Sequence, residues 1–114
     1  MKIIIFGSRH LNPSIDVLHS IIVNNQVNIT QIIDGGCRGI DQLGKEYGLI
    51  HKIPVTTVAA EWNRYGRSAG PIRNAKMVEL ADMGICIWDG KSKGTLDTIN
   101  KLKATGKPVI VHIV

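Results

Sequence analysis

The chain has 114 residues, which is enough for one domain with a continuous core, spanning residues 1–114, and too few for two. A hydrophobic fraction of 44% and a charged fraction of 20% are those of an ordinary globular protein and argue against a disordered chain. No apolar run approaches the roughly 20 residues that cross a bilayer, and the run after Met1-Lys2 is too short for a secretion signal, so we expect a cytoplasmic protein without membrane partners.

The formal net charge is +5, and the arginines are placed less evenly than the lysines. All five arginines fall where we expect strand ends, loops or first helical turns, whereas the nine lysines are spread more widely. Arginine's planar fork suits bidentate contacts with phosphate. The placement therefore favours an anion-binding face over a generally basic surface, which would explain the charge but not the bias. The arginines are Arg9, Arg38, Arg64, Arg67 and Arg73.

A buried-type strand over residues 3–6 opens the chain, and the Gly7-Ser8-Arg9 turn follows it at once. Helical and strand patterns then alternate. The further predicted strands span residues 29–33, 54–59, 84–88 and 108–113. The first two predicted helices are one that begins at Asn12-Pro13 and ends at residues 24–26, and one with a buried stripe from Ile40 to Ile50. The other two are a helix from about Ile72 to Ala81, with Met77, Leu80 and Ala81 on one side, and a helix with the apolar residues Leu96, Ile99 and Leu102 that ends at Gly106.

Residues 61–71 fit neither pattern, because they are too polar and too rich in glycine for a strand. They include Trp62 and Tyr65, two of the five aromatic residues. We expect a loop here, and a loop of this length in a compact domain is more often functional than idle. Its aromatic rings, beside arginines, suit stacking on a nucleobase, but they suit a hydrophobic lid or a subunit contact as well.

Five near-continuous hydrophobic strands that alternate with four helices predict an α/β fold, a doubly wound parallel sheet with helices on both faces. With a strand order of 3-2-1-4-5, the order reverses between strands one and four. The turns after Phe6 and Trp88 should therefore border one crevice. Backbone N–H groups and the positive ends of helix dipoles face such crevices, so we expect a site for an anionic ligand such as a nucleotide phosphate.

Three glycine-bearing turns supply candidate phosphate contacts. Gly7-Ser8-Arg9 offers backbone donors, a hydroxyl and a guanidinium. Gly35-Gly36-Cys37-Arg38-Gly39 opens a helix with Asp41 in its first turn, where the carboxylate either meets a ligand or complements the helix dipole. In the turn that starts at Asp89, Gly94-Thr95 opens a helix, and the Thr95 hydroxyl either caps it or meets a phosphate.

Arg73-Asn74 begins the third predicted helix, where an arginine is unfavourably placed relative to the helix dipole. This placement indicates an anionic partner, which is either a ligand or a neighbouring Asp or Glu. The cysteines, Cys37 and Cys86, have no CxxC spacing and are predicted to be free thiols. The four histidines show no ligand spacing either, so we assign no metal and no cofactor.

Taken together, several blocks resemble the YspA/YpsA-related branch of the SLOG superfamily over almost the whole chain. They are Gly7-Ser8-Arg9, Gly35-Gly36-x-Arg38-Gly39-x-Asp41, Trp62-x-x-Tyr65-Gly66-x-x-Ala69-Gly70-Pro71-x-Arg73-Asn74-x-x-Met77 and Gly94-Thr95. The middle block is quite specific. The resemblance implies a Rossmann-like domain that binds nucleotide-type ligands and forms homo-oligomers, either dimers or tetramers.

This superfamily includes the LOG phosphoribohydrolases, which cleave the base from a nucleoside monophosphate. Residues 73–77 resemble their Arg-Lys-x-x-Met block, so the resemblance makes Arg73 catalytic if the chain is a hydrolase. Their Pro-Gly-Gly-x-Gly-Thr-x-x-Glu turn is altered, because the proline is missing and Thr98 stands where the catalytic glutamate belongs. Cleavage of an N-glycosidic bond calls for a nearby carboxylate. The candidates are Asp97, Asp41, Asp89 and Glu61.

A second group of relatives is the DprA family, whose Rossmann-like core has a similar Gly-Ser-Arg start and an opening like Arg38-Gly39-Ile40-Asp41. That resemblance implies binding of single-stranded DNA, with which a basic crevice next to Trp62 and Tyr65 is compatible.

The sequence therefore favours a domain that binds, senses or sequesters a nucleotide or nucleotide-derived ligand, such as an ADP-ribose or NAD-related molecule. Hydrolysis of a nucleotide N-glycosidic bond and binding of single-stranded nucleic acid are the alternatives. The predicted ligand-binding residues are Gly7, Ser8, Arg9, Gly35, Gly36, Arg38, Gly39, Asp41, Trp62, Tyr65, Arg73, Asn74, Asp89, Gly94 and Thr95.

Overall fold

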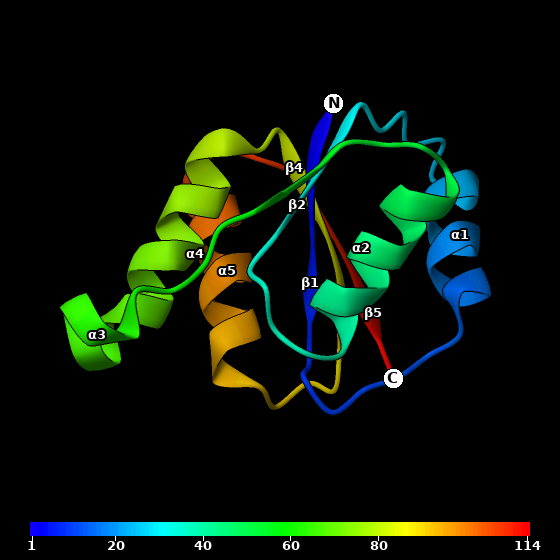
Figure 1. Cartoon of the computed structure of the whole chain (residues 1–114). Helices are drawn as coiled ribbons and strands as arrows, with labels where there is room; N and C mark the ends of the chain where they lie inside the picture. The colour runs from blue at the N-terminus through cyan, green and yellow to red at the C-terminus, as the bar shows by residue number, and fades with distance from the viewer.

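The computed structural model describes all residues from 1 to 114 and contains a five-stranded, all-parallel sheet in the order β3-β2-β1-β4-β5 (Figure 1). The predicted α/β fold and strand order are thereby confirmed. The strands are β1 (Lys2–Gly7), β2 (Gln31–Asp34), β3 (Val55–Thr57), β4 (Met83–Trp88) and β5 (Val109–Ile113). The helices are α1 (Ile15–Asn24), α2 (Ile40–Ile50), α3 (Trp62–Tyr65), α4 (Ala69–Leu80) and α5 (Lys93–Ala104), with a 3₁₀ turn, η1 (Gly66–Ser68).

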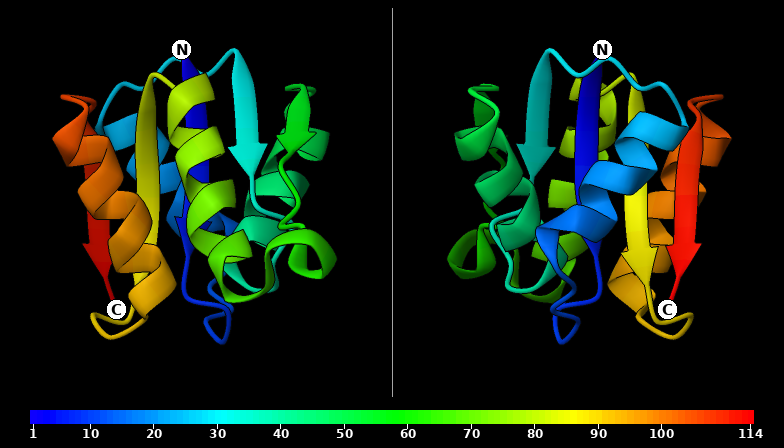
Figure 2. Two further views of the ribbon diagram at one scale, coloured as in Figure 1. Left: turned by 90° about the vertical axis from the view of Figure 1, so that its left-hand side faces the viewer. Right: turned by 90° about the vertical axis from the view of Figure 1, so that its right-hand side faces the viewer.

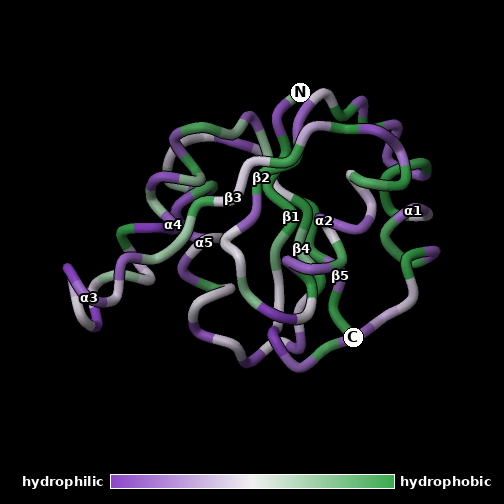
Figure 3. The backbone as a smooth tube through the Cα atoms, in the orientation of Figure 1, coloured by the Kyte–Doolittle hydropathy of each residue, from purple (hydrophilic) through white to green (hydrophobic).

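Successive side chains of β1 point to opposite faces of the sheet, and the hydrophobic core therefore has two layers. Ile3 and Ile5 pack with apolar residues of α1 and α2, whereas Ile4 and Phe6 pack with those of α4 and α5. Figure 2 shows these helix pairs on opposite faces of the sheet, and Figure 3 shows hydrophobic colour along the central strands. Because β1 is buried on both faces, it reads as a continuous apolar run in the sequence.

Glycine lets β1 approach its neighbours closely where the site begins. A Cβ atom on Gly7 would lie 1.9 Å from the carbonyl oxygen of Ile87, so any larger residue would force β1 and β4 apart. Gly44 plays the same part for α2, since a Cβ there would lie 3.0 Å from side-chain atoms of Ile5. These contacts set the distance between the central strands and the helix that carries Asp41.

The start of α1 differs from the prediction. Asn12-Pro13 does not open this helix, because Ser14 is its N-cap and the Ser14 hydroxyl accepts a hydrogen bond of 3.2 Å from the Asp16 amide. A serine in extended conformation can satisfy a free N–H of the first turn, and Ser14 is closer to the apolar stripe than Asn12.

The third predicted helix is α4, and it begins three residues earlier than expected, at Ala69 rather than Ile72. Pro71 lies in its first turn, where a missing N–H costs nothing. Leu80 is 47% exposed and lies off the buried side, which carries Val78 instead. Residues 61–71, predicted as a loop, contain α3, η1 and the first turn of α4, because short helical turns satisfy the backbone groups of this polar segment.

Candidate functional site

The turns that follow β1 and β4 meet at the carboxyl edge of the sheet, which is the lower edge in Figure 1. The Ser8 amide donates to the carbonyl of Ile87 at 3.2 Å, and the Asp89 amide donates to the Ser8 hydroxyl at 3.1 Å. The predicted crevice at the reversal of strand order is thereby confirmed as a meeting of these two turns. Ser8 itself is fully buried and holds the turns together.

Two adjoining cavities open at this edge and share Arg9, Cys37 and Arg73. We call them the small cavity, of about 60 Å³, and the large cavity, of about 410 Å³, and the two together the cleft. The small cavity is also lined by Phe6, Gly7, Asp41, Asn74, Met77, Ser92, Gly94, Thr95 and Thr98. The large cavity is also lined by Gly35, Gly36, Arg38, Ala59, Ala60 and Trp62.

Arg73 lines both cavities although its side chain comes from the middle of α4 and is only 7% exposed. Its Nη1 donates to the carbonyl of Gly35 at 2.6 Å, and its Nε donates to Asn74 Oδ1 at 2.9 Å. No carboxylate oxygen lies within 4.0 Å of the guanidinium, and Nη2 has no hydrogen-bond partner in the protein. A buried charge is normally paired, so this arginine has capacity left for an anion.

Asn74 fixes the position of Arg73 by linking α4 to α5. Its amide nitrogen donates to Asp97 Oδ2 at 3.0 Å and to the carbonyl of Gly94 at 3.4 Å, while its oxygen accepts from Arg73. Asp97 is also paired with Lys101 at 2.6 Å. The Asp97 carboxylate is therefore held in a contact between helices and does not line the cleft.

Asp41 supplies the cleft's only carboxylate. Its Oδ2 accepts from the amides of Gly35 at 3.0 Å and Cys37 at 3.2 Å, so the side chain orders the loop that precedes α2. Burial raises the pKa of Asp41 to about 6, against the lowering effect of those two hydrogen bonds. Oδ1 has no hydrogen-bond partner in the protein. Asp41 thus has a structural role, and it also lines the small cavity, where contact with a ligand stays a prediction.

The N-terminus of α5 faces the small cavity through Gly94 and Thr95. The amide groups of residues 93–95 have no hydrogen-bond partner in the protein, and Ser92 gives no side-chain cap. The Thr95 hydroxyl donates to Ser92 Oγ at 3.2 Å instead of capping the helix. Free N–H groups at the positive end of a helix dipole are donors for a phosphate.

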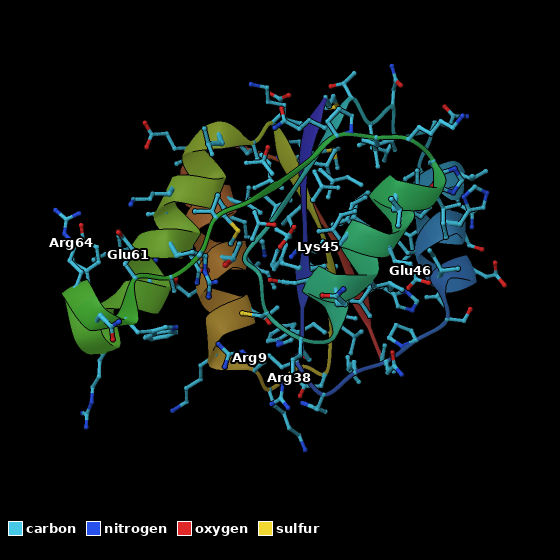
Figure 4. All side chains as sticks on the ribbon, in the orientation of Figure 1. Arg9, Arg38, Lys45, Glu46, Glu61 and Arg64 are labelled. Carbon is cyan, nitrogen blue, oxygen red and sulfur yellow. The ribbon has the colours of Figure 1, made fainter.

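The large cavity is lined by three guanidinium groups and by no carboxylate. In Figure 4, Arg9 and Arg38 lie at the lower edge of the molecule, whereas Arg64 points outward from α3. Trp62, which is 53% exposed, lines the large cavity from α3. Its ring offers an apolar wall beside the arginines, an arrangement that suits a planar group such as a nucleobase.

The structure brings most of the predicted site residues together and leaves four outside the two cavities. Those in the cleft are Gly7, Arg9, Gly35, Gly36, Arg38, Asp41, Trp62, Arg73, Asn74, Gly94 and Thr95. Gly39 lies behind the site, where a Cβ would come 2.6 Å from the carbonyl oxygen of Ser8. Tyr65 lies under Arg64, whose guanidinium carbon is 5.0 Å from its ring centre.

The other two predicted residues outside the cavities are Ser8, which joins the two turns, and Asp89, which orders the turn that it begins. Its Oδ1 accepts from the amides of Lys91 and Ser92 at 2.8 and 2.9 Å, and its Oδ2 lies 3.1 Å from His10 Nε2. The hydrogen bonds from the Lys91 and Ser92 amides lower the pKa of Asp89. This carboxylate therefore supports the turn before α5.

The cleft also contains residues that the sequence did not single out as ligand-binding. Cys37 lies between the predicted Gly36 and Arg38, and Ala59-Ala60 follows β3 at the same sheet edge. The other turns were singled out because they directly follow a strand, and the same criterion would have identified Ala59-Ala60. Both cysteines are free, and no group of His, Cys, Asp and Glu side chains is placed to hold a metal ion.

Comparison with known proteins shows a weak similarity to a phage protein. No family model and no solved structure matches the chain. The chain is 29% identical to the Gene 61 protein of Mycobacterium phage D29 over an 85-residue alignment that covers 69% of this chain and 68% of that protein. The name of that protein states no activity. No helix has the length and hydropathy to cross a membrane.

Proposed function

We propose that this chain is a SLOG-type domain that binds a nucleotide or nucleotide-derived ligand, such as an ADP-ribose or NAD-related molecule, in the cleft. The observation that carries this proposal is Arg73, a buried guanidinium that lines both cavities and makes no salt bridge, although the Asp41 carboxylate lies near enough for the two charges to attract each other. A protein that only needed a stable core would gain by replacing such a charge with an apolar residue.

The volumes and lining residues of the two cavities support a division of the ligand between them. The small cavity has room for a phosphate-sized group, where the free amides of α5 and the Arg73 guanidinium converge. The large cavity has a volume in the range of small-molecule sites and is lined by Arg9, Arg38 and the Trp62 ring. A phosphate with an attached ribose and base matches this order of polar and aromatic walls.

The experiment is isothermal titration with ADP-ribose, NAD and AMP, together with native mass spectrometry of the freshly purified protein. Arg9→Ala should weaken binding about tenfold or more, because a charged hydrogen bond contributes about 1.5–3 kcal/mol. Arg9 is exposed, so this variant should remain folded. Arg67→Ala removes the same charge outside both cavities and serves as the matched control. Equal affinities of the two variants would remove the site assignment.

Hydrolysis of the N-glycosidic bond is the second candidate, because Asp41 places a carboxylate with a pKa of about 6 in the small cavity beside Arg73. A carboxyl group with such a pKa suits general acid and base catalysis near neutral pH. Thr98, at the position of the LOG glutamate, is buried and donates to the carbonyl of Gly94 at 3.4 Å. Thr98 lines the small cavity, but its hydroxyl carries no negative charge and so cannot do what that glutamate does.

Chromatography of nucleoside monophosphates and NAD after incubation separates the two candidates. Released base that is abolished by Asp41→Asn would identify a hydrolase. Intact ligand retained by the protein would identify a binder, which is the outcome that we expect.

We also propose that the chain forms a homo-oligomer. The edge strand β5 has no Lys, Arg, Asp or Glu, and its residues Val111 and Ile113 are exposed, as is Val114 directly after it. Edge strands without charges pair readily with another chain. Size-exclusion chromatography with light scattering should show a mass above 12.5 kDa, and a monomer at all concentrations would contradict the proposal.

A further inference from the structure

Cys37 is the nucleophilic side chain that both cavities share. Its thiol is partly exposed, and its Sγ lies 3.7 Å from Arg73 Nη1. Arg9 also lines both cavities. A thiol that a reagent can reach, and that lies among cationic side chains able to hold an anionic reagent, is placed to exchange with a disulfide.

Arg73, which lies next to this thiol, has a free donor for an anion. Arg73 is buried and makes no salt bridge, its Nη1 contacts Cys37 Sγ, and its Nη2 has no hydrogen-bond partner in the protein. Arg38 adds a third guanidinium to the large cavity, which has no carboxylate. The positive charge of the large cavity, which Cys37 also lines, should therefore attract a disulfide that carries carboxylates.

We propose that Cys37 is a reversible modification site, at which a low-molecular-weight disulfide bearing carboxylates, of the glutathione disulfide type, leaves a mixed disulfide that occupies the large cavity. The exchange itself follows from Cys37 and its arginines alone. Its consequence, that the adduct blocks the cleft, rests on the proposed nucleotide-binding function.

The exchange balances without another reactant. Cys37 loses its proton to solvent, and the thiolate attacks one sulfur of the disulfide. A bond forms between Cys37 Sγ and that sulfur while the original sulfur–sulfur bond breaks. The second half of the reagent leaves as a thiolate and takes up a proton. Cys37 is oxidised, the leaving sulfur is reduced, and a small thiol reverses the reaction.

Cys86 provides an internal control within the same chain. It is fully buried in β4, and burial raises the pKa of its thiol to about 12. A buried thiol with a raised pKa exchanges slowly because little thiolate is present and no reagent reaches it. The folded protein should therefore gain one adduct, on Cys37, and a second only after unfolding.

The test measures the rate of adduct formation by intact-mass spectrometry near neutral pH. The probes are glutathione disulfide, which is anionic, and cystamine, which is cationic, each normalised to its rate with a small model thiol. We expect glutathione disulfide to be favoured about tenfold, with the preference reduced at high salt, because the cavity's charge steers the reagent. Arg9→Gln should reduce the preference, and Arg67→Gln, which removes a charge outside the cleft, should not.

Three results would overturn the proposal: no adduct in folded protein, an adduct that persists in Cys37→Ser, or equal normalised rates for the two probes. For the consequence, ADP-ribose affinity is measured before and after glutathionylation and again after reduction. We expect a loss of about tenfold or more that reduction restores, and no change on the same treatment of Cys37→Ser. An unaltered affinity would refute the block.

The two failures are distinguishable. If no nucleotide binds the reduced protein, the proposed function and the block fall together, while the rate ratio still decides the exchange at Cys37. If nucleotide binds but the rate ratio is one, the proposed function stands and the modification site does not.

Discussion

At Asp41, burial and hydrogen bonding act in opposite directions. Two backbone amides donate to its Oδ2 and favour the carboxylate, but the loss of water around a nearly buried side chain outweighs them. The resulting pKa of about 6 means that the folded protein keeps the Asp41 proton at pH values where the unfolded chain has already lost it. Ionising this residue therefore costs the folded state free energy, a common feature of functional sites.

This cost predicts a pH dependence of stability. Between about pH 4 and pH 6 the folded state binds more protons at Asp41 than the unfolded state does, so its contribution to stability falls as the pH rises. The loss is complete above the folded pKa and amounts to about 2–3 kcal/mol at most. Asp41→Asn, which keeps an oxygen for the two amides, should be more stable than the wild type by about that amount near pH 7.5 and equal to it only near pH 3, below the pKa of the unfolded chain.

Urea denaturation of both proteins at those two pH values measures the difference. Other carboxylates, such as Asp89, contribute equally to both proteins and cancel in the comparison. A difference in the free energy of unfolding that is the same at both pH values, or a variant that is less stable than the wild type near neutral pH, would contradict this account of Asp41.

The sequence predicted the location of some side chains in the cleft correctly and of others incorrectly. Arg9 was found because an arginine at a strand end has few structural explanations. Arg73 was singled out because it was expected at the start of its helix, although α4 begins at Ala69 and Arg73 lies beyond its first turn. Ser8 and Asp89 have the same residue types and positions as ligand contacts, but each is used to hold a turn. Which partner a short polar side chain takes depends on atoms brought from a distant part of the chain, and no local pattern records it.

At the scale of elements, glycines on α2 and α5 have opposite roles. Gly44 lies against β1, where a Cβ would come 3.0 Å from Ile5, so the helix and strand would have to separate. Gly94 in the first turn of α5 has no atom within 4 Å of its Cβ position. Gly44→Ala should therefore destabilise the protein by about 1–3 kcal/mol. Gly94→Ala should leave it unchanged or stabilise it by up to about 1 kcal/mol.

Thermal unfolding of the two variants gives the comparison, and ligand titration adds a second reading. Because Gly94 lines the small cavity, its alanine variant should lose affinity without losing stability. A stable Gly44→Ala protein would show that α2 has room to move over the sheet.

Element types were predicted well because hydrophobic periodicity is set by the two-faced burial of the sheet. The ends of elements were not, since Ser14 and the first turn of α4 depend on which hydrogen bonds the flanking residues make. The short helix α3 has no buried residue, so no apolar period marked it in the sequence.

For the whole molecule, the distribution of charge separates a pocketed ligand from a nucleic-acid strand. A single strand that follows the basic surface releases counterions from each phosphate it uses, so its affinity falls steeply with salt. A ligand in the cleft is held in part by the buried Arg73 and uses far fewer phosphates than a strand does, so we expect its affinity to fall less than about fivefold between about 50 and 200 mM salt.

Arg64 and Arg67 allow a sharper version of this comparison, because both are exposed and lie outside the two cavities. The double variant Arg64→Gln/Arg67→Gln lowers the net charge from +5 to +3 without touching the cleft. Titration should show unchanged ADP-ribose affinity, and any binding of oligo-dT, read by fluorescence anisotropy, should weaken because two phosphate contacts are lost. Oligo-dT binding that falls steeply with salt, together with no ADP-ribose binding, would favour the nucleic-acid function instead.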